Sequence, residues 1–551
     1  MVHSARSIPS LLAAFAVVAL VAVVYWPGLH GDWGRDDFMQ LAFARLVGSP
    51  WPPFVQDHYV PAPGTVFRPL GFASFWLSAA LFGTDYAAHA AGDLALHAGV
   101  ALALFGLLRR AALPAPPAFA ATLIFALHPA AIGTALWWSA RFDLLAALFV
   151  LLALRAGLAY REDGRPLALA GALAALLAAL SSKEIGLVAV PALSLLWLRR
   201  GPAPRRAWGA IALAWLCAAA WFGWRWHVLG TPASGLTGAM PIAQALAKGL
   251  RDWLHQAAGY LSYAPRLGGP ARIALAAAAL LAALLAAAAF ARRRPQRGLA
   301  DLALAGLCLV ALPALVQAPV AALNAAPLGP GMSAVEAAMQ ARLYYLGLAG
   351  VAMLVAALLA PAWAAAATPL RRGAALAPLV LIAAVLGGVS HGQARAFAAR
   401  SAEIAAVAHE AVAAVAALDL PHARCRVVFL GVEPPPEWSI YVSMDSVVKA
   451  LSADPRRVGH CWFEADYPTF FNLMAAPAEA ADALPYRPLE IDGAAVPWRR
   501  IGGLVAAYVR PPAAAVQAQA LDGLRVLRRT PGGFADVTAE VASSGVPLQL
   551  R

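Results

Sequence analysis

Charged residues are scarce in this sequence. Asp, Glu, Lys and Arg make up 13% of its 551 residues, about half the share found in an average soluble domain. Hydrophobic residues account for 61%, so a water-soluble globular enzyme is excluded. Lysine occurs only at positions 183, 248 and 449. The preference for alanine and arginine is typical of a GC-rich bacterial genome.

Long apolar runs take the place of the missing charge. A helix that crosses a membrane needs about 20 mostly apolar residues, and we predict an all-α polytopic membrane protein with about eleven such helices. They lie near residues 8–27, 86–108, 116–136, 143–160, 166–181, 185–198, 207–229, 271–291, 299–320, 342–360 and 374–390. The first run ends without an Ala-x-Ala cleavage site, so we expect it to be retained.

The net charge of +13 is explained by orientation. Arginines gather in alternate loops, at 109–110, 161–165, 199–206, 292–294 and 371–372. Short loops rich in Lys and Arg stay in the cytoplasm. We therefore predict a bacterial inner-membrane protein whose N-terminus is cytoplasmic and whose long loop 28–85 and C-terminal tail are periplasmic. No nucleic-acid partner is needed to account for the charge.

The tail differs from the rest of the chain. From residue 391 it holds 15 basic and 16 acidic residues, with a helical stretch near 393–417 and strand-like runs at 426–430 and 504–509. We predict a transmembrane domain at 1–390 and a small soluble α/β domain at 391–551. Two of the four cysteines, Cys425 and Cys461, lie in this tail. They could form a disulfide in an oxidising compartment or remain free thiols.

Two adjacent carboxylates, Asp36 and Asp37, follow the first helix in the predicted outer loop. Such a pair can supply a general base and a group that orients it, or it could hold Mg²⁺ or Mn²⁺. The alternative is a solvated loop with helix-capping aspartates. We expect no other cofactor.

Four cations are predicted on the same side of the membrane. They are Arg68, before a proline that can open a helix, and Arg141, Lys183 and Arg342 at other outer turns. Each alone could be an interfacial anchor. Together with two aspartates they suit a lipid-linked phosphate beside a carboxylate base.

Other polar residues on this side could support such a site. His89, Asp93 and His97 recur along one helical face, where they could ligate a metal or form a hydrogen-bonded polar seam. Asp143 begins its helix and could cap it or pair with Arg141. The remaining candidates are His128, Glu184, Tyr345, Trp137, Trp138 and Trp253, of which the tryptophans could stack on sugars or form an interfacial belt.

Read in order, these segments resemble the membrane glycosyltransferases of the C-type fold. They are most similar to bacterial relatives of the tetratricopeptide-linked O-mannosyltransferases, which use dolichyl-phosphate-mannose. The matching elements are Asp36-Asp37, Phe67-Arg68-Pro69-Leu70, Leu96-His97, His128-Pro129 with Arg141 to Ala146, Ser182-Lys183-Glu184, and Arg342 with Tyr345. The chain departs from the pattern at Gly133, where Glu is frequent, at Asp93 in place of Asn, and at Ala341 in place of an acidic residue. It also lacks the tetratricopeptide repeats.

The resemblance implies transfer of a sugar from a polyprenyl-phosphate donor to a protein, glycan or lipid acceptor of the cell envelope, with inversion at the anomeric carbon. Asp36 is expected as the base and Asp37 as its partner. Arg342 and Lys183 would bind the donor phosphate, supported by Arg141, Arg68 and Tyr345, and His97, His128, Asp143, Glu184, Trp137 and Trp138 would support the substrates. Two other functions remain open: a flippase for a lipid-linked sugar, and an inactive membrane scaffold whose tail binds a periplasmic partner.

Overall fold

The structure is a computed structural model of the 551-residue chain. It describes residues 8–58, 66–199, 204–231, 247, 297–324, 333–420, 425–438, 442–466, 473–477, 490–491, 494–495, 499–501, 504–508 and 524–544. The predicted span at 271–291 and Trp253 lie outside these residues.

Two compact units make up the chain. The first comprises Met1–Leu29, Ala90–His227 and Thr231–Ala398, and the second comprises His30–His89, Val228–Gly230 and Ala399–Arg551. Helices α5 (Tyr86–Arg110) and α17 (Pro369–Ala416) run from one unit into the other. The helix expected near 393–417 is thus the last part of a helix that begins well before residue 391.

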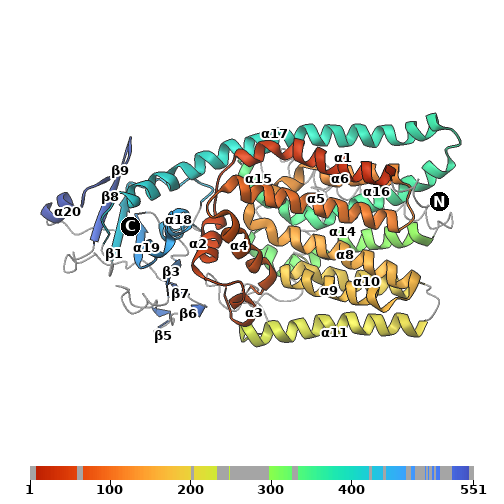
Figure 1. Ribbon diagram of the computed structural model, residues 1–551, viewed down its shortest axis with the longest axis horizontal. Coiled ribbons are helices and arrows are strands. Elements are labelled where there is room, and N and C mark those ends of the chain that lie inside the picture. Colours follow the sequence, from red (N-terminus) through yellow and green to blue (C-terminus); the bar gives the residue numbers. More distant parts are fainter. Residues whose placement is uncertain are drawn as a thin grey trace. The chain divides into compact units, whose positions relative to one another are not determined.

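The first unit is a helical bundle whose long members lie side by side (Figure 1). Besides α5 and the first part of α17, its elements are α1 (Ile8–Tyr25), η1 (Trp26–His30), α6 (Ala115–Ala126), η2 (Pro129–Ala131), α7 (Ile132–Leu136), η3 (Trp138–Ala140), α8 (Arg141–Asp163), α9 (Pro166–Ser182), η4 (Glu184–Val188), α10 (Ala189–Leu198), α11 (Pro204–Leu229), α14 (Arg297–Asn324), α15 (Ala334–Ala341), η6 (Arg342–Tyr344) and α16 (Tyr345–Ala365).

Local sequence sets where these helices turn and how closely they pack. Helix α8 ends at Gly164, which adopts the left-handed conformation (φ 64°), and α9 begins directly afterwards with Pro166. Helices α14 and α16 touch through their backbones at Gly306 and Gly350. A Cβ added to Gly350 would lie 2.6 Å from the Gly306 carbonyl oxygen, so small residues permit this close approach.

Six described helices are long and apolar enough to cross a membrane, and the chain is a multi-pass membrane protein. They match the predictions at 8–27, 86–108, 143–160, 207–229, 342–360 and 374–390. The run at 116–136 forms two helices bent by 56°, which make a seventh span if counted as one. The runs at 166–181, 185–198 and 299–320 contain only shorter apolar helices by the same test. The prediction of eleven spans is therefore supported for six or seven.

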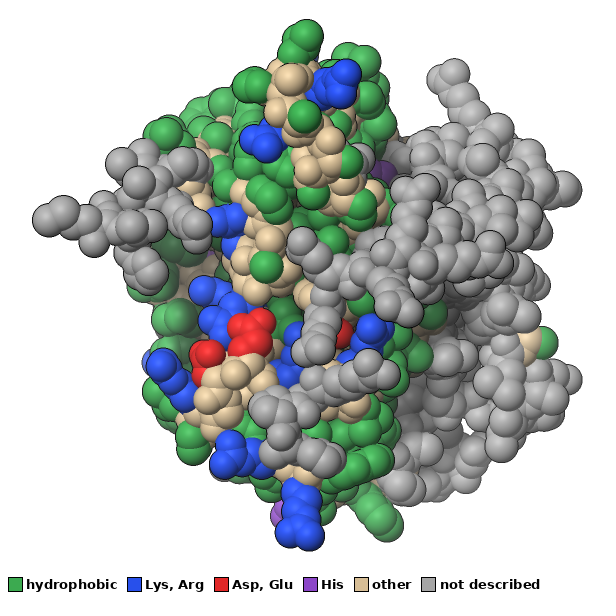
Figure 2. All heavy atoms as spheres, turned by 90° about the vertical axis from the view of Figure 1, so that its right-hand side faces the viewer, with side chains coloured by type: hydrophobic (Ala, Val, Ile, Leu, Met, Phe, Trp, Pro, Cys, Tyr) green, Lys and Arg blue, Asp and Glu red, His purple; other side chains and the backbone are tan. Residues whose placement is uncertain are grey.

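Arginine-rich helix ends meet at one end of this bundle. Helices α5 and α8 end there and α11, α14 and α17 begin there (Figure 1). Figure 2 shows this end, where Lys and Arg side chains gather on the surface. Asp301 of α14 is buried between Arg161, at 2.6 Å, and Arg199, at 3.3 Å. Arg161 and Arg199, from two of the arginine-rich loops, thus meet at the same carboxylate.

The second unit combines the predicted outer loop with the tail. The loop contains α2 (Asp36–Leu46), α3 (Pro52–Val55) and α4 (Pro69–Phe82), of which α4 is a short apolar helix. The tail adds the last part of α17, α18 (Met444–Leu451), α19 (Pro455–Gly459) and α20 (Thr538–Ser544). Phe38 of α2 packs edge-on against Trp438, at 5.8 Å between ring centroids. The Arg45 guanidinium donates to the carbonyls of Ala450 and Ser452 at the end of α18, at 2.7 and 2.6 Å.

The strands form small sheets. They are β1 (Cys425–Leu430), β2 (Cys461–Ala465), β3 (Leu473–Pro477), β4 (Glu490–Ile491), β5 (Ala494–Ala495), β6 (Arg499–Ile501), β7 (Leu504–Tyr508), β8 (Leu524–Thr530) and β9 (Gly533–Asp536). The largest sheet has the order β2-β1-β8-β9, with β2, β1 and β8 parallel and β9 antiparallel. The strands expected at 426–430 and 504–509 are present as β1 and β7. Strands and helices in the tail agree with the expected mixture of α and β.

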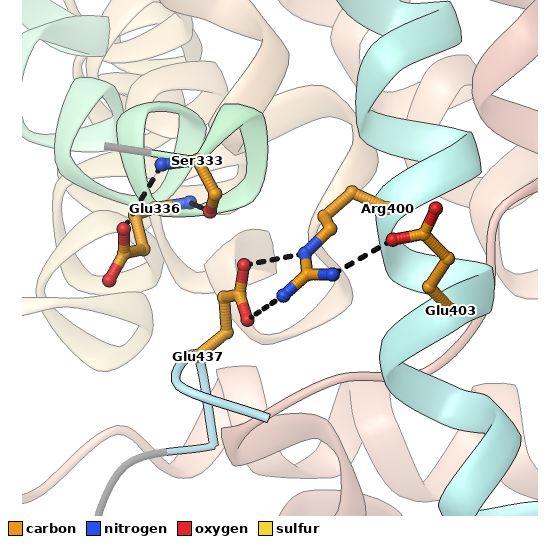
Figure 3. Close-up of polar contacts among 5 residues, drawn as sticks. All are labelled: Ser333, Glu336, Arg400, Glu403 and Glu437. Atoms are coloured by element: carbon orange, nitrogen blue, oxygen red, sulfur yellow. Dashed lines mark hydrogen bonds and ion pairs between the residues drawn. The ribbon is translucent and has the colours of Figure 1, made fainter. Parts of the chain in front are cut away.

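The tail is held together by a disulfide and by buried ion pairs. Cys425 and Cys461 are paired in register at the starts of β1 and β2, and they form a disulfide with Cα atoms 4.4 Å apart. Arg400 of α17 donates two hydrogen bonds to the buried Glu437, at 2.7 and 2.8 Å, and one to Glu403 at 2.8 Å (Figure 3). This bidentate pair fixes the loop after β1 to α17.

The start of α15 in the first unit is also set by its sequence. The Ser333 backbone NH donates to the Glu336 carboxylate at 3.1 Å, and the Glu336 NH donates to the Ser333 hydroxyl at 3.2 Å (Figure 3). This reciprocal capping box defines the N-terminus of the helix that leads to Arg342.

Candidate functional site

The aspartate pair begins helix α2 in the second unit. Arg35, just before it, has φ 49°, a turn that places both carboxylates in the first helical turn. Asp37 is buried and accepts a hydrogen bond from the Gly34 NH at 3.3 Å, while its own NH donates to the Gly34 carbonyl at 3.0 Å. The Asp36 side chain is 36% exposed and lies 4.0 Å from the Arg35 guanidinium. Asp37 therefore holds the turn, and Asp36 is the more accessible of the two carboxylates.

Asp32 is a neighbour that the sequence did not single out. Its carboxylate lies 2.8 Å from His409 Nε2, and its NH donates to the Ser401 hydroxyl at 3.0 Å. These contacts fix the loop before α2 to the end of α17. No sequence signal joins residues so far apart.

Arg68 precedes Pro69, and α4 begins at that proline as predicted. Phe67 beside it is fully buried, which anchors the arginine at the helix start. His58 is buried in the same unit against Phe72, at 4.2 Å between ring centroids, and its Nδ1 lies 3.2 Å from the Gln56 carbonyl. Burial lowers the pKa of His58 to about 4, so the ring is neutral near pH 7.

Arg141 and Asp93 form a buried ion pair in the first unit. Arg141 Nε lies 2.6 Å from an Asp93 carboxylate oxygen, and their side chains are 5% and 1% exposed. The second Asp93 oxygen is buried without a hydrogen-bond partner among the described residues. The pair joins α5 to the start of α8 and places a guanidinium inside the bundle.

Lys183 pairs with Asp143. Its amine lies 2.6 and 2.8 Å from the two carboxylate oxygens. Asp143 therefore pairs with Lys183 and not with Arg141, the partner considered from the sequence, because the α8–α9 hairpin returns the end of α9 to the start of α8. Glu184 follows as the first residue of η4.

Two tryptophans connect the cations. The Arg342 guanidinium lies over the Trp137 ring at 4.5 Å, and the Arg141 guanidinium lies over the Trp138 ring at 5.4 Å. Both rings are almost fully buried. Arg342 also donates to the Met339 carbonyl at 2.7 Å. The two indoles position guanidinium groups, a role that neither predicted use of these tryptophans anticipated.

These contacts make one connected set in the first unit, which we call the cation cluster: Arg141, Lys183 and Arg342, with Asp93, Asp143, Trp137 and Trp138. Trp137, Trp138, Arg141 and Asp143 lie close together in the chain, and this stretch links the contacts made by the three cations. Arg141 and Lys183 each lie against one carboxylate, and Arg342 lies over an indole ring. Such a set can bind an anion and stabilise negative charge that develops on it.

A polar seam lies beside the cation cluster. His97 Nδ1 is 2.6 Å from the Tyr345 hydroxyl, and His97 Nε2 is 3.0 Å from the Ala126 carbonyl. Tyr25 donates to the same carbonyl at 3.1 Å, while His128 Nδ1 accepts from the Ala130 NH at 3.1 Å. Tyr345, predicted near the donor phosphate, is buried and bonded to a histidine here.

The three residues at helical spacing on α5 have separate partners. His89 lies 2.6 Å from the Ser78 hydroxyl, Asp93 binds Arg141 and His97 binds Tyr345. Among the described residues no group of three or more His, Cys, Asp or Glu side chains could hold a metal ion. The polar-seam interpretation therefore fits these residues, and the metal interpretation does not.

Comparison with known proteins gives structural similarities only. No family model matches the chain, and no curated protein sequence does. Structures of the oligosaccharyltransferase from Archaeoglobus fulgidus are similar. One, tethered with an acceptor peptide, has a TM-score of 0.43 and 13% identity, covering 81% of this chain and 64% of that chain. Another, named AglB and in complex with an inhibitory peptide and a dolichol-phosphate, has a TM-score of 0.40 and 13% identity, covering 81% of this chain and 65% of that chain.

ArnT from Cupriavidus metallidurans, bound to undecaprenyl phosphate, is also similar, with a TM-score of 0.41 and 12% identity over 90% of this chain and 97% of that chain. The present chain spans less than two thirds of the length of the archaeal structures.

Proposed function

We propose that this protein is a membrane glycosyltransferase that moves a sugar from a polyprenyl phosphate to an acceptor hydroxyl. The observation that carries the proposal is the cation cluster, in which Arg141 and Lys183 each meet a carboxylate and Arg342 meets an indole inside the helical bundle. Arg141, Lys183 and Arg342 all come from motifs that matched the C-type glycosyltransferases. Dolichol-phosphate and undecaprenyl phosphate, the lipids of two similar structures, belong to the class of donor lipid meant here.

The proposed reaction is a single displacement at the anomeric carbon. The acceptor oxygen forms a bond to that carbon while the bond to the phosphate oxygen breaks, so the configuration inverts. Asp36 takes the proton of the acceptor hydroxyl, and Asp37 holds the turn that presents Asp36. The polyprenyl phosphate leaves with the bonding electrons.

The cations stabilise that leaving group. Arg342 and Lys183 bind the phosphate, with Arg141 and Arg68 in support. A donor that already carries a phosphate leaving group needs no acid to protonate it. Asp36 and Asp37 offer two carboxylates, one of them bonded to Gly34, and no third acidic or histidine ligand joins them among the described residues. This set does not suit Mg²⁺ or Mn²⁺, which favour six oxygen ligands, so the proposed steps use none.

The membrane orientation is part of the proposal. Arginine-rich helix ends favour the cytoplasm, and the Cys425–Cys461 disulfide favours an oxidising compartment for the tail. We therefore place the tail in the bacterial periplasm. Ala402 and Leu370 are exposed. In cells that express a chain without Cys217 and Cys308, an impermeant maleimide should label Ala402→Cys directly and Leu370→Cys only after the inner membrane is opened. The reverse pattern would overturn the orientation.

The function itself is tested by its product. Purified protein in lipid nanodiscs, supplied with a panel of polyprenyl-phosphate sugars, should release polyprenyl phosphate when the acceptor is present. Mass spectrometry of envelope glycans and lipids from a deletion strain should identify the acceptor by its missing sugar. No change in any envelope glycan or lipid, together with no release in vitro, would refute the proposal.

A flippase for a lipid-linked sugar is the second candidate, because the buried Asp93–Arg141 pair lies within the bundle and transporters use paired intramembrane charges. A flippase moves the fluorescent lipid-linked sugar across the bilayer and leaves the sugar on its lipid. Measuring both quantities in the same proteoliposomes separates the two functions. A scaffold would give neither.

A further inference from the structure

A groove of about 650 Å³ lies along the α8–α9 hairpin of the first unit. Helix α8 lines it at every third or fourth residue from Phe149 to Ala159. Helix α9 lines it with Leu167 near its start and then, from Ala168 to Ala178, with four alanines and one glycine. Because most of these α9 side chains are small and apolar, this side of the groove has room for a methylene chain.

An arginine side chain enters this apolar groove. Arg155 of α8 lies eight residues before the end of the helix at Asp163, which is about 12 Å along its axis. Its guanidinium lies 3.5 Å from the position that a Cβ on Gly106 of α5 would occupy. Within the part of the chain that the structure describes, no hydrogen bond or ion pair joins Arg155 to a protein group. A charged side chain at this depth in a membrane helix is costly unless a counter-charge meets it.

A second arginine lies at the mouth of the groove and has protein partners. Arg110 lines the groove and lies 2.7 Å from Glu162 and 3.1 Å from Asp163. Two guanidinium groups therefore lie near an apolar channel, and the deeper one lacks an acidic partner among the described residues. Arg110 belongs to the last turn of α5, at the arginine-rich end of the bundle, where headgroups of the surrounding leaflet would lie.

We propose that this groove binds an anionic glycerophospholipid. Its phosphate accepts hydrogen bonds from Arg155, with Arg110 beside it, and one acyl chain lies along the small-residue face of α9. The charge complementarity and the apolar lining together favour a phospholipid over a soluble phosphate. The site is separate from the cation cluster, because Arg155 is fourteen residues or about 21 Å along α8 from Arg141.

Matched variants of the full-length protein test the site. Arg155→Gln removes the charge in the groove, and Arg165→Gln removes an exposed arginine of the same hairpin that does not line it. Ala174→Leu fills the channel, and Ala170→Leu adds the same volume at an exposed position of α9 outside it. Native mass spectrometry measures binding of phosphatidylglycerol and of zwitterionic phosphatidylethanolamine, and thermal unfolding checks that each variant folds.

We expect wild type, Arg165→Gln and Ala170→Leu to retain phosphatidylglycerol and to prefer it over phosphatidylethanolamine. Arg155→Gln should weaken phosphatidylglycerol binding about tenfold, as expected for loss of a charge-assisted hydrogen bond, and Ala174→Leu should weaken it by a similar factor. Equal binding by all five proteins, or no preference for the anionic lipid, would overturn the proposal. So would Arg155-dependent binding of undecaprenyl phosphate in place of phosphatidylglycerol.

Discussion

Replacing Arg141 by methionine should destabilise the bundle severely. The change leaves the Asp93 carboxylate, 1% exposed, without a cation among the residues that the structure describes. Breaking a buried pair by removing one partner costs about 3–5 kcal/mol, because the remaining charge is uncompensated. Asp93→Asn should cost a similar amount. The asparagine oxygen can still accept the hydrogen bond from Arg141, but the buried Arg141 charge loses the negative charge of Asp93.

The double variant Asp93→Leu/Arg141→Met removes both charges. Replacing a buried pair by apolar residues of similar volume is often neutral or stabilising by about 1–4 kcal/mol. The free energy of unfolding, measured with denaturant in micelles, should therefore return to near the wild-type value. The double-mutant cycle should give a coupling of several kcal/mol, well above the error of additivity of about 0.5 kcal/mol.

Activity of the same double variant distinguishes structure from chemistry. If Arg141 also stabilises the donor phosphate, the double variant should be stable but should transfer sugar about a hundredfold more slowly, as for loss of one preorganised donor. A loss of less than 1 kcal/mol in Arg141→Met would refute the energetic reasoning. Full activity in the double variant would show that Arg141 only holds α5 and α8 together.

Three further predictions concern stability. Because burial lowers the pKa of His58 to about 4, the folded protein binds fewer protons there than the unfolded chain. The pKa shift of His58 should contribute about 3 kcal/mol to the free energy of unfolding. This contribution should be complete above pH 6.5 and lost as pH falls towards 4. If a His58→Gln variant shows the same pH dependence of unfolding as wild type, the prediction is wrong. The double variant Cys425→Ser/Cys461→Ser removes a disulfide that closes a loop with a sequence separation of 36. It should lower the free energy of unfolding of the tail by about 4 kcal/mol, measured with denaturant. An unchanged unfolding midpoint would contradict this prediction. Gly350→Ala should lower the unfolding midpoint, with a loss of about 1–3 kcal/mol in the free energy of unfolding. Gly373→Ala is the control, because a Cβ at Gly373 would meet nothing within 4 Å. Equal midpoints for the two variants would refute the close contact of α14 and α16.

Apolar runs predicted the long helices because length and hydrophobicity are local properties. The apolar run at 116–136 predicts one straight span, but Pro129 follows His128 in it, and a proline removes a backbone donor and bends the chain. The sequence did not predict helices α2 and α3 within the loop 28–85, and it indicated α4 only through the proline at its start. Only α4 has an apolar sequence, and its fourteen residues are too few for the span criterion.

Residue partners were harder to predict than residue candidates. The motifs identified Arg141, Asp143 and Lys183, but which carboxylate each cation meets depends on how α5, α8 and α9 pack. The same applies to Cys425 and Cys461, whose pairing follows from the parallel register of β1 and β2. A local sequence pattern does not show which helices or strands become neighbours in the folded protein.

The central claim is that Asp36 is the base of a sugar transfer. The most direct measurement is the rate of transfer from a polyprenyl-phosphate sugar by Asp36→Asn in nanodiscs. Asp85→Asn serves as control, because Asp85 is an exposed carboxylate that caps a helix start in the same unit, and asparagine caps equally well. We predict that Asp36→Asn lowers the rate about 10²–10⁴-fold while Asp85→Asn keeps the wild-type rate. Transfer by Asp36→Asn at the wild-type rate would contradict the proposed mechanism.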